Sequence, residues 1–402
     1  MKVYKNIKEL LTLEGAHKKD GRNLNSKDLN IITNAALVVN EEGKIEWVGE
    51  MQNLPNHYAN YHEEDCRDLV ITPEIVDSHT HLVFGGDRSF EYTMRLNGES
   101  YEKIAQMGGG ILSTMNSTLN ASEEDLFESA CQRIERIHSF GIGTIEIKSG
   151  YALTYEGEKL ISQIIHKLKE KYRGKVNIFN TYLAAHAVPK TYANSGQYIH
   201  EVVIPLLKEL AQDDIVDAVD IFHEEGYFNT QDVHDLFKLA KDLNIPTKIH
   251  ADEFNDNKGA VIACEYNSLS CDHLLATTDD GIRALSNSKT VATLLPGTAF
   301  FLGKPLADAR AFLDAGCKLA IASDYNPGSC HCDNLILLAQ LAAKSLNLNS
   351  CELWSAITLN SAHALGLTNQ GAIIKGMDAK ISKFRTSSLD NILYSWGKNF
   401  AV

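Results

Sequence analysis

Short runs of apolar, β-branched residues alternate with longer amphipathic segments from about residue 75 to residue 350. This alternation is typical of βα units around a parallel sheet. Candidate strands begin near eight residues: Ile75, Gly143, Asn177, Asp217, Thr247, Ser268, Thr290 and Lys318. Eight such units predict a (β/α)8 (TIM) barrel, in which an active site gathers at the carboxyl ends of the strands. The structural alternative is a doubly wound open sheet, which gives no reason for the first, fifth and eighth strands to converge.

Two of the segments between these strands carry clear helix signals. One opens at Ser122, with Asp125 three residues further on, which is the pattern of a helix N-terminus. Its apolar residues then share one helical face: Leu126, Ala130, Ile134 and Ile137. Another helix is predicted to start near Asn229, with an apolar face made of Val233, Leu236, Phe237, Ala240 and Leu243. We therefore expect amphipathic helices between the strands.

The two ends of the chain have a different pattern. Residues 36–49 predict two strands joined by a turn, and residues 371–402 contain further candidate short strands around Gly371 and Gly376. Both ends are predicted to build one small β-sandwich domain, made of residues 1–72 and 365–402. The barrel would then occupy residues 73–364, and a chain of 402 residues is long enough for both parts.

Charge and composition narrow the class of protein. The chain has 38 Lys and Arg against 52 Asp and Glu, and the net charge of −14 argues against nucleic acid and anionic membranes as partners. The sequence shows no secretory h-region and no apolar run long enough to span a bilayer. Eight cysteines without a C-x-x-C pair do not resemble a disulfide framework. These features predict a soluble, cytoplasmic protein.

Candidate metal ligands lie at the ends of three predicted strands. His79 and His81 end an apolar run and would project to the same side of a strand. A lone H-x-H pair is weak evidence among 15 histidines. It gains weight because His250 ends another apolar run and Asp324 ends a third. The pattern predicts a hydrolytic metal centre built from three histidines and one aspartate.

Five short motifs extend this interpretation to a family. They are residues 76–81, 146–151, 185–189, 250–254 and 323–329. With these motifs the chain resembles, over essentially its full length, the imidazolonepropionases within the amidohydrolase superfamily. The first and last motifs are found across the superfamily, and the middle three point to the narrower family. The family hydrolyses the cyclic amide of 4-imidazolone-5-propanoate to N-formimidoyl-L-glutamate in histidine degradation.

The resemblance implies a ligand set and a catalytic set. His79, His81, His250 and Asp324 would hold one zinc or iron ion, which lowers the pKa of a bound water and polarises a carbonyl. Glu253 would relay a proton between the attacking water and the departing ring nitrogen, and Asp324 would share this base role. His273 would stabilise the oxyanion that forms at the ring carbonyl.

The resemblance also implies a substrate pocket. Arg88 would pair with the propanoate carboxylate. Tyr151, His186 and Glu253 would surround the substrate, and the polar groups of the product would meet the 326–329 loop through Asn326, Gly328 and Ser329. The expected partner is this small-molecule substrate, and the family's usual form is a homodimer.

Four residues need separate mention. Glu74 stands where the family usually has Gly and is expected to strain a turn. Leu119 replaces a common Arg, which questions a second cation for the substrate, and Lys380 replaces a usual Asp. Lys148 is interpreted as a polar neighbour of the site rather than as a metal-bridging carboxylated lysine.

Two alternative functions stay open at this point. A nucleobase deaminase of the same superfamily would use the same metal ligands, but a neutral base would not need Arg88 and Tyr151. A catalytically dead barrel acting as a scaffold would have no reason to keep costly buried polar groups together. The sequence does not decide between zinc and iron, because imidazole and carboxylate ligands accept both.

Overall fold

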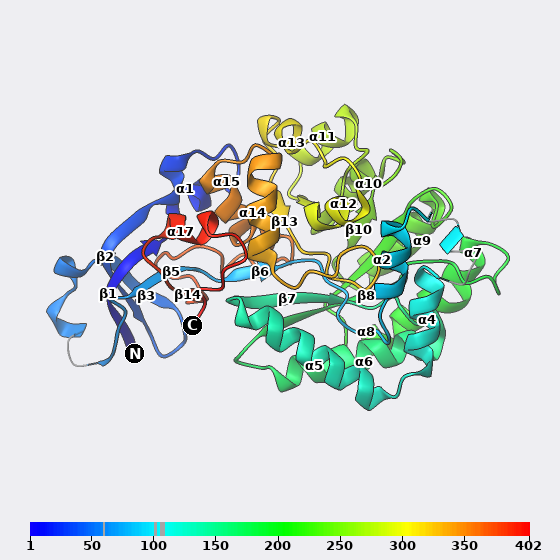
Figure 1. The fold of residues 1–402 in the computed structure, drawn as a ribbon, viewed down its shortest axis with the longest axis horizontal. Helices are drawn as coiled ribbons and strands as arrows, with labels where there is room; N and C mark the ends of the chain where they lie inside the picture. The colour runs from blue at the N-terminus through cyan, green and yellow to red at the C-terminus, as the bar shows by residue number, and fades with distance from the viewer. Residues whose placement is uncertain (59–60, 100–102, 105–108) are drawn as a thin grey trace.

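A computed structural model describes residues 1–58, 61–99, 103–104 and 109–402 (Figure 1). Its larger sheet has eight parallel strands that neighbour one another in chain order from β6 to β13. These strands are β6 (Ile75–Asp77), β7 (Ile142–Lys148), β8 (Asn177–Ala185), β9 (Ala218–His223), β10 (Lys248–Ala251), β11 (Ser270–His273), β12 (Val291–Leu294) and β13 (Leu319–Ile321). All eight predicted strands are present, and each begins within two residues of its expected start. The predicted (β/α)8 barrel is confirmed.

The first and last strands meet just beyond their carboxyl ends. The backbone N–H of Asp324 donates to the carbonyl of His79 at 2.9 Å, and that of His81 donates to the carbonyl of Tyr325 at 2.9 Å. Thr80 and Tyr325 form a parallel bridge between these two hydrogen bonds. We call this ladder the seam. It closes the barrel and places two segments with candidate ligands side by side.

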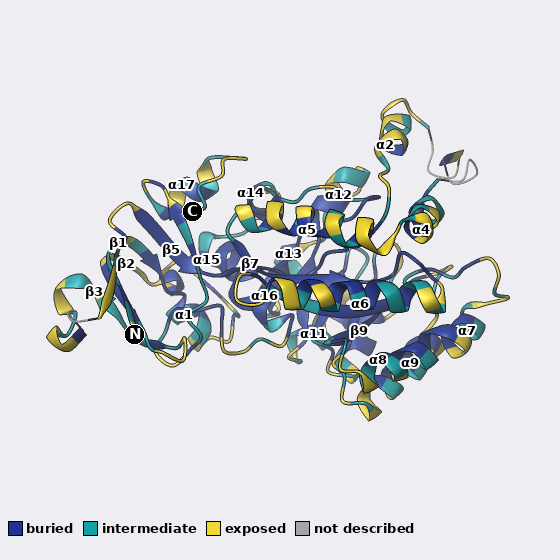
Figure 2. Ribbon diagram, turned by 90° about the horizontal axis from the view of Figure 1, so that it is seen from below, coloured by how far each residue is buried: buried dark blue, intermediate teal, exposed yellow. Residues whose placement is uncertain are grey.

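Helices lie around the barrel, and the longest of them turn one face to solvent (Figure 2). In chain order they are α2 (Ser89–Leu96), α4 (Ile111–Asn120), α5 (Glu123–Ser139), α6 (Tyr155–Lys171), α7 (Ser195–Tyr198), α8 (Ile204–Gln212), α9 (Thr230–Asp242), α10 (Gly259–Glu265), α11 (Asp279–Ser286), α12 (Pro296–Leu302), α13 (Ala309–Asp314), α14 (Leu335–Ser345), α15 (Ser350–Ala356) and α16 (Leu359–His363). Both predicted helix starts are confirmed. The Ser122 side chain caps α5 by accepting from the Asp125 N–H, and Asn229 forms a capping box with Asp232 at the start of α9.

Strands from the two ends of the chain form a second sheet beside the barrel (Figure 1). It contains β1 (Lys2–Leu11), β2 (Ile31–Val39), β3 (Ile45–Glu50), β4 (His62–Asp65), β5 (Leu69–Pro73) and β14 (Ile381–Arg385), with the short helix α1 (Glu14–Lys18) after β1. The small terminal domain is therefore confirmed, whereas its boundaries at residues 72 and 365 stay a prediction. The prediction of several strands after Gly371 is corrected, since this region has one strand and the helix α17 (Leu389–Tyr394).

One continuous core joins the two parts. Leu10 of β1 and Ile71 of β5 belong to the same buried cluster as Ile142 and Ile145 of β7. Burial of apolar area on this scale is the main source of stability in a folded domain. Among the described residues, no helix combines the length and the apolarity needed to cross a membrane.

Glu74 does not strain its turn, contrary to our expectation. Its backbone is not among the positive-φ residues, and its buried carboxylate accepts a hydrogen bond from the Thr144 hydroxyl at 2.6 Å. A Cβ atom added at Gly143 would lie 2.2 Å from a Glu74 carboxylate oxygen. The missing side chain at Gly143 therefore makes room for the carboxylate that stands at position 74.

Candidate metal centre

Four predicted ligands converge at the seam. The Nε2 atoms of His79 and His81 are 3.3 Å apart, and each lies 3.5 Å from Oδ1 of Asp324. Ligand atoms of His79, His81 and His250 all lie within 4.8 Å of one another. The structure therefore brings the four residues together from β6, β10 and β13, as the barrel prediction required.

The spacing of these atoms fits a single metal ion. Ligands held about 2.1 Å from a tetrahedral ion lie about 3.4 Å apart, which is close to the separations of the nitrogen and oxygen atoms at the seam. The buried Nε2 of His250 has no hydrogen-bond partner among the described residues, as expected for an atom reserved for an ion. This donor set suits one zinc or iron ion.

The protonation states of the candidate ligands also suit the binding of a metal ion. Burial, together with the charges of neighbouring groups, holds the pKa values of His79 and His81 well below the usual value for histidine. Both imidazoles are therefore neutral at pH 7 and keep a lone pair for a metal. Burial raises the pKa of Asp324 to about 6, so this carboxyl group is mainly ionised at neutral pH.

Two further aspartates fix the orientation of the histidine rings. Oδ2 of Asp272 lies 2.7 Å from Nδ1 of His79, and Oδ2 of Asp220 lies 3.1 Å from Nδ1 of His250. A carboxylate at Nδ1 favours the tautomer that leaves Nε2 unprotonated. Neither aspartate was assigned a role from the sequence. A signal was present for Asp220, which is a charged residue among the apolar residues of β9, whereas the residues around Asp272 in β11 are mostly polar.

Two lysines form ion pairs with these aspartates. Nζ of Lys148 lies 2.6 Å from Asp220 and 2.9 Å from Glu146, and Nζ of Lys248 lies 3.0 Å from Glu146. We call these five fully buried residues the floor network: Glu146, Lys148, Asp220, Lys248 and Asp272. Lys148 is thus an ion-pair partner inside the barrel, as interpreted from the sequence.

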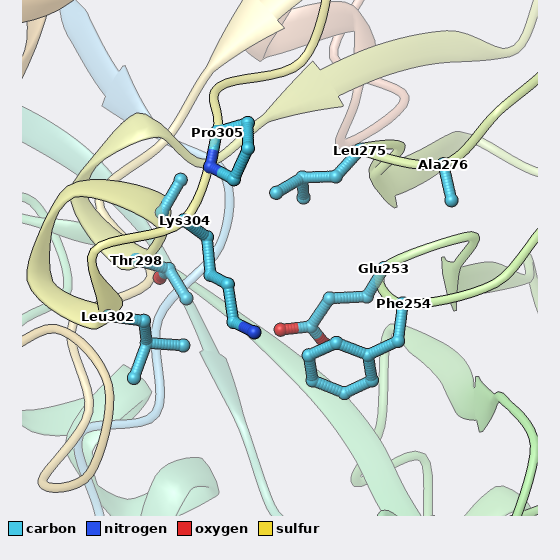
Figure 3. A pocket seen from close by; sticks show the side chains of 9 residues that line it. Glu253, Phe254, Leu275, Ala276, Thr298, Leu302, Lys304 and Pro305 are labelled. Atoms are coloured by element: carbon cyan, nitrogen blue, oxygen red, sulfur yellow. The ribbon is translucent and has the colours of Figure 1, made fainter.

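A cavity of about 500 Å³ opens beside the ligands. Its lining includes seven of the residues assigned to substrate or product from the sequence: Arg88, Tyr151, His186, Glu253, Asn326, Gly328 and Ser329. A smaller cavity of about 260 Å³ shares Glu253, Phe254, Leu302 and Lys304 with it (Figure 3). We call the shared rim around Leu302 and Lys304 the mouth. Figure 3 shows the Lys304 side chain extending toward the carboxylate of Glu253.

Glu253 is not the solvated loop carboxylate that an isolated acidic residue would usually be. Its side chain is 11% exposed, and Oε1 lies 3.7 Å from Nδ1 of His273. Burial, assisted by the nearby carboxylates of Asp324 and Glu224, raises the pKa of Glu253 to about 8. A carboxyl group with a pKa near the working pH is suited to both taking and giving a proton.

The structure places His273 at the end of β11, facing the ligands. Its ring lies 5.3 Å from the ring of His250 and 5.7 Å from that of His79. Burial keeps the pKa of His273 well below the usual value, so the imidazole is neutral and still carries one N–H. It is therefore available as a hydrogen-bond donor.

Arg88 lines the cavity and is paired with the buried carboxylate of Glu91. Its guanidinium contacts the Glu91 carboxylate through Nε at 2.9 Å and Nη2 at 2.8 Å. A Cβ atom added at Gly328 would lie 2.0 Å from Nη1 of Arg88. The two contacts to one oxygen of Glu91, Oε2, and the missing side chain at position 328 hold the arginine in place.

The remaining pocket residues differ in what they leave available. The His186 ring stacks on that of His81 with centroids 5.2 Å apart, and Nδ1 of His186 lies 3.0 Å from the Gly150 carbonyl. Asn326 uses its amide within its own loop, where the oxygen accepts from the N–H groups of Gly328 and Ser329. Asn326 therefore shapes the wall of the cavity.

Sequence reasoning missed two cations of the cavity, Arg95 and Lys304. Nη2 of Arg95 donates to the Gly328 carbonyl at 2.8 Å. Leu119, which raised the question of a second cation, is exposed and does not line the cavity. Isolated basic residues on helices and loops carry no pattern that separates them from surface charges.

The backbone is strained at three residues around the candidate metal centre. Asp252, His273 and Asp324 have positive φ angles of 51°, 81° and 49°, which non-glycine residues rarely adopt. Each of these residues lies at or just beyond the end of a barrel strand. Strain of this kind persists where the surrounding structure fixes the backbone, and it gathers at functional sites.

Solved structures share this fold at low sequence identity. The chain superposes on an atrazine chlorohydrolase from Arthrobacter aurescens TC1 complexed with zinc with a TM-score of 0.73, at 14% identity, covering 100% of this chain and 93% of the other. For a guanine deaminase from C. acetobutylicum the TM-score is 0.69 at 16% identity, covering 98% and 94%. Fold and site together define the class of protein: a (β/α)8 barrel with a candidate metal centre at the carboxyl ends of its strands.

Sequence relatives narrow this class. The chain is 36% identical to the imidazolonepropionase of Clostridium tetani over 99% of its length and 94% of the relative. It is 37% identical to that of Bacillus velezensis over 99% and 93%, and 36% identical to that of Christiangramia forsetii over 98% and 96%. A scan against protein-family models gave no match. The chain belongs to the imidazolonepropionase family.

Proposed function

We propose that this chain hydrolyses the cyclic amide of 4-imidazolone-5-propanoate to N-formimidoyl-L-glutamate. The observation that carries this proposal is a single cavity whose wall presents a cation, Arg88, and a buried carboxylate, Glu253, close to the histidine cluster. An anionic tail and a hydrolysable ring amide need these two groups at different positions in one pocket. The full-length similarity to imidazolonepropionases supports the choice of substrate.

Binding would use the cations of the cavity. Nε and Nη2 of Arg88 are engaged by Glu91, which leaves Nη1 for the propanoate carboxylate. A charge-assisted hydrogen bond of this kind contributes about 1.5–3 kcal/mol. Tyr151 and His186 also line the cavity and would hold the imidazolone ring in orientation.

The chemical steps would use groups already in place around the cluster. His79, His81, His250 and Asp324 would hold the ion, which when bound supplies Lewis acidity for activating water and polarising the ring carbonyl. Glu253 would take a proton from the attacking water, and His273 would donate a hydrogen bond to the oxyanion. The ring C–N bond then breaks, and Glu253 returns its proton to the departing nitrogen. One water is consumed, and the new carboxylate appears on the former carbonyl carbon.

Three further expectations accompany this proposal: a homodimer, a location in the cytoplasm, and the limits of the two domains. The homodimer is inferred from the family's usual form. The cytoplasm is inferred from the cysteine pattern, and the eight cysteines are all free thiols in the structure. The domain limits proposed from the sequence place the complete site inside the barrel.

The test follows the loss of ultraviolet absorbance of freshly generated imidazolone propanoate with purified protein. We expect decay that stops after chelation and returns on adding zinc or iron, with about one metal ion per chain. The His250→Ala variant is the matched control, because it removes one ligand without touching the cavity lining. Bound metal without any decay of this substrate, but with turnover of guanine or another cyclic amide, would contradict the proposal.

A further inference from the structure

The floor network does not contact the cavity, and the proposed chemistry makes no use of it. All five side chains are fully buried, and a buried charge without a partner is strongly destabilising. A purely structural role could be filled by apolar residues of similar size at lower cost. A role in the metal site that it contacts would explain why the network is charged.

The connections within the network run toward the metal ligands. Asp272 contacts His79, Asp220 contacts His250, and each aspartate is approached by a lysine. Lys148 lies 2.6 Å from Asp220, and both Lys148 and Lys248 lie 3.8 Å from Asp272. Lys248 also donates to the carbonyl of Ser78 at 2.8 Å, and Ser78 is next to His79 in the chain.

The charge count fits one divalent ion. Two lysines against three carboxylates leave the floor network with one negative charge, and Asp324 adds another. A divalent cation on neutral histidines would make the buried centre neutral as a whole. Without the lysines, the same centre would carry an excess of buried negative charge.

We propose that Lys148 and Lys248 are positioning residues for the metal centre, which hold Asp272 in place as the acceptor for the Nδ1–H group of His79 and hold the Asp220 carboxylate close to Nδ1 of His250. This inference rests on the metal-dependent part of the proposed function and not on the identity of the substrate. Outer partners of metal ligands change metal affinity by about 10- to 100-fold when they are removed. The lysines act one contact further out, through the two aspartates.

The test measures zinc affinity of the purified, metal-stripped protein by competition with a chromophoric chelator. For Lys248→Met we expect affinity to fall about 10-fold or more. Charge alone predicts the opposite, because removing a cation near a divalent ion strengthens its binding. A loss therefore reports positioning, whereas unchanged or tighter zinc binding would overturn the proposal.

The matched control is Lys318→Met, which removes another buried lysine away from the metal ligands; its partner Asp20, at 2.7 Å, is exposed. It should lower thermal stability without changing zinc affinity. The double variant Glu146→Gln/Lys248→Met removes one charge of each sign, so that it can fold even if Lys248→Met cannot. We expect it to bind zinc several-fold more weakly and to lose the uniform Nδ1–H signature of His79 in ¹⁵N NMR spectra. If both readouts match the wild type, the lysines do not position the histidines, and this result would stand even if the substrate were a different one.

Discussion

The floor network and the mouth lie on opposite sides of the same histidine cluster. Every side chain of the floor network is closed to solvent and ion-paired within the barrel strands. The mouth is formed by α12 and the segment after it, where Lys304 is exposed and Leu302 is partly exposed. Charge is used on both sides, but only the floor network is shielded from water.

This difference separates two requirements of an enzyme. A metal centre needs ligands fixed in orientation, and buried, mutually paired charges supply that rigidity because any displacement leaves a charge unpaired. The exposed cation at the mouth tolerates variation, because a charge in water can be replaced by another at small cost. Substitutions near the mouth should therefore alter substrate binding, and substitutions in the floor network should alter chemistry and metal retention.

Glu253 stands between the two regions, and its removal should have the largest effect on turnover. Glu253→Gln keeps the shape of the side chain and removes the base, so we expect kcat to fall about 100- to 10,000-fold. Metal content should stay at the wild-type level, as measured by elemental analysis beside steady-state kinetics. Full activity of this variant would show that proton transfer uses another group.

The pH profile sharpens the same assignment. Burial and the carboxylates of Asp324 and Glu224 raise the pKa of Glu253 to about 8, and only the ionised form can accept a proton. The value of kcat/KM should therefore rise as pH rises through about 8, and Glu253→Gln should lack this limb. Glu224→Gln removes one neighbouring negative charge and should move the limb to lower pH. A limb that does not move would contradict the proposed electrostatic cause.

Arg88→Ala should have the next largest effect, and it should appear in binding. We expect KM to rise about 10- to 100-fold with a smaller change in kcat, because a charge-assisted contact to the substrate tail is lost. Glu91 would be left buried and unpaired, so Arg88→Ala/Glu91→Gln is the control for misfolding. A fall in kcat at unchanged KM in both variants would argue against binding of the carboxylate by Arg88.

Lys304→Met tests the mouth and should have the smallest effect. An exposed charge contributes about 0.2–1 kcal/mol, so KM should rise at most about fivefold while kcat and metal content stay constant. Lys190→Met is a matched control, because Lys190 is exposed and does not line the cavity. A large loss of kcat in Lys304→Met would mean that the mouth also takes part in chemistry.

The sequence predicted the barrel and the convergence of the candidate ligands because both depend on local, repeated patterns, whereas the ligand set itself stays a prediction. Eight β-branched runs define the strands, and His79, His81, His250 and Asp324 each follow the end of such a run. The rule that strand ends share one face of a barrel then brings them together. The prediction that Glu74 strains a turn was wrong. Its carboxylate fits because Gly143, which is distant in sequence, has no side chain.

The floor network and the mouth could not be predicted in the same way. Lys248 and Glu146 meet across strands β10 and β7, which are not adjacent in the sheet, and no spacing in the sequence signals this contact. Lys304 follows α12 and Glu253 follows β10, and the two residues line the same two cavities although they are distant in sequence. Long-range pairs of charges depend on the closed geometry of the barrel, and single-sequence patterns do not contain it.

The seam has a consequence for how the protein is assembled. His79 and His81 follow the first barrel strand and Asp324 follows the last, so that nearly the whole barrel is synthesised between them. Contacts across so long a loop form late, because the entropy of closing it opposes them until the intervening strands are in place. An ion that needs all four ligands binds the closed barrel and not its open precursors, and it stabilises the closed form by mass action. Metal retention is therefore a measure of whether folding has been completed.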